Sequence, residues 1–100
     1  MTERTANPDL EKAETLALEA LKFLAEDVQR FGGFLAATGI GPAALRAEAA
    51  SPRVLAAVLD HLMQDEPLLL TFSANAGILA AAIPEAARLL ACQAAAETRS

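Results

Sequence analysis

The sequence predicts an all-α fold, a compact orthogonal bundle of five or six short helices forming a single helical domain over residues 1–100. Three observations favour this fold class. Alanine and leucine, both strong helix formers, make up 41 of the 100 residues. Apolar residues recur at the three- and four-residue spacing of a helix, and no long stretch alternates between apolar and polar residues. Residues that begin or end helices then divide the chain at several points.

The first helix is expected to begin at Asn7-Pro8, because asparagine suits the N-cap and proline suits the first turn. The residues before it, 1–7, and those of the tail, 97–100, are expected to fray. The apolar arc of this helix is wide, so the helix either lies at the centre of the bundle or also meets a partner. Its expected stripe comprises Leu10, Ala13, Ala17, Leu21 and Leu24, flanked by Leu18 on one side and by Leu16, Ala20 and Phe23 on the other.

Asp27 can cap a second helix, which Gly39 ends. The side of this helix that faces the core is expected to carry Val28, Phe31, Leu35 and Thr38. Gly32 and Gly33 lie inside it and cost about 1 kcal/mol each relative to alanine. Gly41-Pro42 opens a short third helix that continues to about Ala50 and is anchored by Leu45.

Ser51-Pro52 combines a capping residue with a proline at the first position, which predicts the start of a fourth helix. This helix has the clearest apolar pattern in the chain. Its expected core residues are Val54, Leu55, Val58, Leu59, Leu62 and Met63.

A fifth helix is expected to start at Asp65-Glu66-Pro67 and to stop at Asn75-Ala76-Gly77. Its three consecutive leucines, 68–70, point in three directions, so the helix is either buried all round or leaves one leucine for an interface. The last helix runs from Ala80 or Pro84 to Glu97. Its expected inner face comprises Ile83, Ala86, Ala87, Leu90 and Ala94.

Several segments together resemble a family of small bacterial proteins catalogued as a domain of unknown function, number 3572. The resemblance runs from Ala13 through about Gly77 and more loosely to Ala91. It rests on the order and spacing of residues 17–27 (ALEALKFLAED), 34–40 (FLAATGI), 42–46 (PAALR), 51–52 (SP), 58–62 (VLDHL) and 65–72 (DEPLLLTF). The resemblance implies a soluble all-helical protein and supplies no activity or site.

Charge and cysteine content restrict the function. Lys and Arg total 8 against 13 Asp and Glu, a net charge of -5, and the basic residues form no run, which argues against a nucleic-acid partner. The uncharged segment from Pro67 to Pro84 contains Asn75 and Gly77 and is better explained by two short helices than by a membrane span. With Cys92 as the single cysteine and no secretory signal at the start, we expect a cytoplasmic location.

The residue types used in catalysis are sparse. His61 is the only histidine, with Asp65 four residues later, but it falls on the flank of its helix, so dipole stabilisation explains it better than catalysis. A metal site of His61, Asp65 and Glu66 is not expected, because these three side chains cannot face one way. Cys92 lies four residues after Arg88, which would favour a thiolate, yet a tolerated small side chain is the simpler interpretation. We therefore expect neither an enzyme nor a cofactor.

The resulting hypothesis is a non-enzymatic protein-interaction module that either self-associates or binds another protein. Its candidate contact residues are Leu16, Phe23, Leu68, Leu69 and Leu70. One alternative is a carrier of a small apolar ligand, with a pocket lined by Phe31, Phe34 and Phe72. Another is a DNA-binding regulator with a helix-turn-helix at Gly39, although only Arg46 of its recognition helix is basic.

Overall fold

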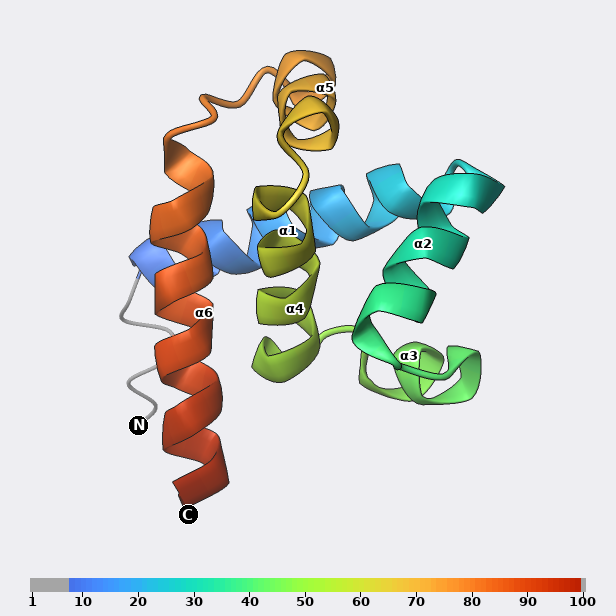
Figure 1. Ribbon diagram of the computed structural model, residues 1–100. Coiled ribbons are helices and arrows are strands. Elements are labelled where there is room, and N and C mark those ends of the chain that lie inside the picture. The colour runs from blue at the N-terminus through green and yellow to red at the C-terminus, as the bar shows by residue number, and fades with distance from the viewer. Residues whose placement is uncertain (1–7, 100) are drawn as a thin grey trace.

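The computed structural model describes residues 8–99, which form six α-helices and no strand (Figure 1). The prediction of an all-α bundle of five or six helices is confirmed. The helices are α1 (Pro8–Ala25), α2 (Val28–Thr38), α3 (Pro42–Glu48), α4 (Pro52–Met63), α5 (Glu66–Ala76) and α6 (Ala82–Arg99).

Three helices form the centre of the fold. Helices α4 and α6 lie side by side and antiparallel, and α1 crosses behind both of them (Figure 1). Helices α2 and α3 lie on the other side of α4 from α6, and α5 lies at one end of the bundle. The radius of gyration of 13.1 Å is the value expected for a compact chain of this length.

The helix starts follow from local capping. Asp27, Ser51 and Asp65 each accept a hydrogen bond from the backbone N–H group of a residue two or three positions further on, at 2.9–3.3 Å. These bonds satisfy N–H groups that have no partner within the helix, so the three predicted N-caps are confirmed. The N-cap expected at Asn7 lies outside the described residues. Two helix ends are also confirmed, since Gly39 and Gly77 adopt the left-handed conformation at φ 75° and 68°.

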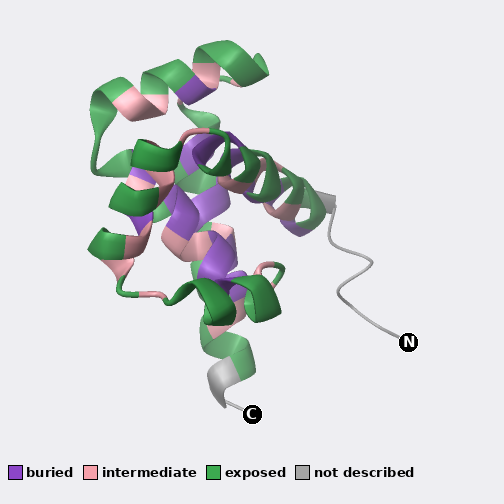
Figure 2. Cartoon of the chain, turned by 90° about the vertical axis from the view of Figure 1, so that its right-hand side faces the viewer, coloured by how far each residue is buried: buried purple, intermediate pink, exposed green. Residues whose placement is uncertain are grey.

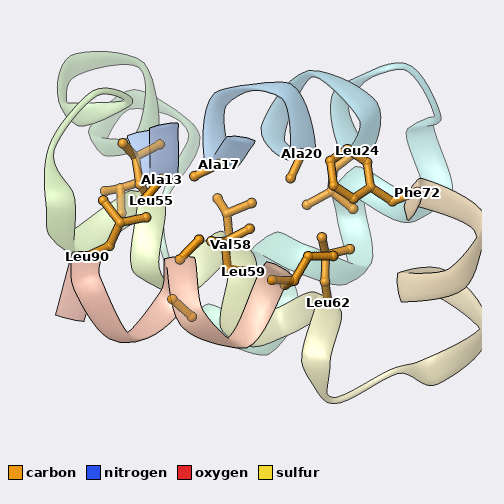
Figure 3. Close-up of a cluster of buried hydrophobic side chains, with 14 of the residues drawn as sticks. Ala13, Ala17, Ala20, Leu24, Leu55, Val58, Leu59, Leu62, Phe72 and Leu90 are labelled. Carbon is orange, nitrogen blue, oxygen red and sulfur yellow. The ribbon is translucent and has the colours of Figure 1, made fainter. Parts of the chain in front are cut away.

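The core is built where α1 meets α4 and α6. Ala13, Ala17 and Ala20 of α1 are almost completely buried and face the side chains of α4 (Figure 3). Because alanine is small, α1 can cross α4 and α6 at a short interaxial distance. The larger side chains that fill the space around this crossing are Leu24, Leu55, Val58, Leu59, Leu62, Phe72, Ile83 and Leu90. Figure 2 shows these buried residues gathered in the interior, with exposed residues on the outer turns.

The inner face of α2 differs from the prediction. Phe34 is fully buried, whereas Val28, expected on the core side, is 88% exposed. At 100° per residue, Val28 lies about 120° around the helix from Phe34, at the edge of the face that packs on the bundle. Phe31 and Leu35 lie between Phe34 and Val28 around the helix and pack against the core as partly buried residues.

Two further residues of the apolar stripes are exposed. Leu18 is 43% exposed, because the buried face of α1 is shifted toward Ala20 and Phe23. Met63, at the last position of α4, is 36% exposed. Toward the end of the chain, α6 begins at Ala82, between the two starts considered, and remains helical beyond Glu97. The fraying expected for residues 1–7 and 100 lies outside the described part of the chain.

The glycines of α2 provide a test of helix propensity. A Cβ atom added to Gly33 meets nothing within 4 Å, and its φ is not positive. Gly33→Ala is therefore expected to stabilise the protein by about 0.5–1 kcal/mol, because alanine loses less backbone entropy on folding. Gly39→Ala is expected to destabilise it by about 1–2 kcal/mol, because alanine is strained at a positive φ. Urea unfolding followed by circular dichroism measures both changes; a loss of stability in Gly33→Ala would contradict the prediction.

Candidate functional site

The candidate contact residues on α1 lie at different depths. Leu16 is partly buried and lines two neighbouring hollows on the surface. Phe23 is only 6% exposed, so it packs in the core and offers little area to a partner. Its ring lies 5.4 Å from the ring of Phe72, and the guanidinium of Arg30 lies over it at 4.4 Å. The structure therefore separates Leu16, a surface residue, from Phe23, a packing residue.

The three leucines of α5 do point in three directions. Leu68 and Leu69 flank the buried Phe72 and pack against the core as partly buried side chains. Leu70 lies about 160° around the helix from Phe72 and is 50% exposed. Since Phe72 faces α1 and the core, Leu70 lies on the outer face of α5, away from Leu16. The five candidates therefore do not form one surface.

A different set of residues surrounds Leu16. Three open hollows follow α1, and each shares a lining residue with the next, so we treat them as one surface, the α1 groove. The first lies against α6 and is lined by Asp9, Lys12, Ala13, Leu16, Ala82, Glu85, Ala86 and Leu89. The second is lined by Glu11, Lys12, Thr15, Leu16, Glu19 and Ile78. The third lies against α5 and is lined by Glu19, Lys22, Phe23, Glu26, Phe72, Asn75 and Ala76.

One residue of the segment 77–81, between α5 and α6, lines the second hollow: Ile78. Gly77 turns the chain out of α5 in the left-handed conformation. Ser73 then holds the turn, because its hydroxyl donates to the carbonyl of Ile78 and its carbonyl accepts from the Ile78 N–H at 3.0 Å. This places Ile78 against α1 and leaves the next residue, Leu79, 80% exposed. Leu79 itself lines none of the three hollows.

The charges around the α1 groove are mostly negative. Five carboxylates line it, against the two ammonium groups of Lys12 and Lys22. One of the five, Glu85, forms an ion pair with Arg88 of the next turn of α6. The hydrogen bond from Arg88 lowers the pKa of the Glu85 carboxyl below its usual value, and the same bond raises the pKa of Arg88. Glu11, Glu19 and Glu26 are exposed; the first two lie on α1, and Glu26 follows its last residue.

The residues considered for catalysis and metal binding take part in packing and helix capping or lie on the surface. His61 is partly buried, and its ring packs edge-on against the buried Phe34, with 5.5 Å between the centroids. The carboxylate of Asp65 caps α5 rather than orienting His61. Over residues 8–99, no group of three or more His, Cys, Asp or Glu side chains is placed to hold a metal ion. Cys92 is exposed on α6.

The packing supports neither the apolar-ligand pocket nor the DNA-binding helix-turn-helix. Phe34 and Phe72 are buried in the core and contact different rings, His61 and Phe23, so the phenylalanines do not converge on one pocket. At the Gly39 turn, the would-be recognition helix α3 has seven residues and a single basic side chain, Arg46. No helix in the described part of the chain has both the length and the apolar character needed to cross a membrane.

Sequence reasoning identified Leu16 but missed Ile78 and Leu89, which line the α1 groove. The segment 77–81 has no helical period, so its apolar residues could not be assigned to a face from the sequence. One available signal was the pair Ile78-Leu79 directly after a helix-ending glycine. In the structure Ile78 is partly buried against α1, whereas Leu79 is exposed.

Comparison with known proteins gives a family. The family described as "Protein of unknown function (DUF3572)" matches the chain over residues 10–93. No curated protein and no solved structure matches the chain.

Proposed function

Because the chain belongs to this family of proteins of unknown function, whose description names no activity, we propose a function from the surface itself. The protein is a non-enzymatic protein-interaction module of the cytoplasm that holds a protein partner in the α1 groove. The single observation that carries this proposal is the open surface along α1, in which the apolar residues Leu16, Ile78 and Leu89 are only partly buried. Contiguous apolar surface rimmed by polar residues is typical of protein-binding sites.

The shape of the site agrees with this function better than with ligand transport or DNA binding. Small-molecule sites enclose most of the ligand, whereas the hollows along α1 are open and follow one helix. The glutamates on their rim would repel a phosphate backbone. A protein partner needs neither an enclosed cavity nor a basic surface.

A photocrosslinking experiment tests the proposal. A crosslinking amino acid replaces Thr15, an exposed residue that lines the second hollow, in the cells that make the protein. We expect a discrete adduct that is lost in Leu79→Asp and retained in Val28→Asp. The two substitutions are matched, since both residues are at least 80% exposed and only Leu79 follows a residue that lines the groove, Ile78.

The mass of the adduct identifies the kind of partner. An adduct of twice the 10.4 kDa chain means self-association, and any other mass means a different protein. A crosslinker at Ala43, on the exposed side of α3, serves as the second control. The proposal is overturned if Thr15 gives no adduct, if Ala43 gives the same adduct, or if Leu79→Asp has no effect.

A further inference from the structure

We draw no further inference here: the strongest candidate, the open alanine-lined hollow between α4 and α6, carries nothing, because Arg53 and Arg88 at its edge are each paired with a glutamate of the same chain and nothing in the structure shows what covers it.

Discussion

Replacing Leu59 with alanine is expected to lower the free energy of unfolding by about 2–5 kcal/mol. Leu59 is fully buried in α4, at the centre of the helices that form the core, and its truncation leaves a cavity that the neighbouring helices cannot fill completely. Urea unfolding followed by circular dichroism at 222 nm gives the change. Because a domain of this size is stabilised by only about 5–15 kcal/mol, the variant should unfold at a much lower urea concentration.

Leu70→Ala is the matched control for this experiment. It makes the same chemical change on α5, where Leu70 is 50% exposed, so we expect a loss below about 1 kcal/mol. A similar loss in both variants would mean that Leu70 is covered in solution, which is the result expected for an interface between copies. Repeating the measurement at two protein concentrations separates these cases, since association makes stability depend on concentration.

Enlarging a buried alanine is expected to be the second severe change. Ala17 of α1 is fully buried where α1 crosses the other two core helices, and Ala17→Leu adds three carbon atoms to that contact. Overpacking of this kind costs about 1–3 kcal/mol or more, because helices or side chains must move apart. We expect a lower melting temperature in a thermal scan, together with an altered near-ultraviolet signal from the core phenylalanines.

Ala95→Leu provides the comparison for Ala17→Leu. Ala95 lies on the exposed side of α6, so the added carbons enter solvent and the two residues have similar helix propensities. A melting temperature within a degree or two of the unsubstituted chain is therefore expected. If Ala17→Leu were equally harmless, α1 would not approach its neighbours as closely as the structure shows.

The sequence predicts the helix boundaries well because capping is local. Asp27, Ser51 and Asp65 each satisfy N–H groups within three residues, and Gly39 and Gly77 adopt a conformation that few other residues tolerate. These effects do not depend on the rest of the fold. They therefore identify the starts of α2, α4 and α5 and the ends of α2 and α5, whereas α6 has no such signal at its start.

The burial of individual residues is predicted less well, because it depends on how the helices are placed. Helix α1 is apolar over a wide arc, and only the positions of the neighbouring helices decide that Ala20 and Phe23 are buried while Leu18 is exposed. The α1 groove shows the same limit. Leu16 could be found from the periodicity of its helix. Ile78 is brought beside it by the turn after α5, and helical periodicity does not predict the direction of that turn.

The arrangement of α1, α4 and α6 also affects how the chain folds. Helix α6 is the last described helix, and its contacts with α1 join opposite ends of residues 8–99. Contacts between residues so far apart in sequence slow folding, since a long loop must close before they form. During synthesis α1 and α4 emerge from the ribosome before α6, so the parts of their apolar faces that α6 covers are exposed until it arrives.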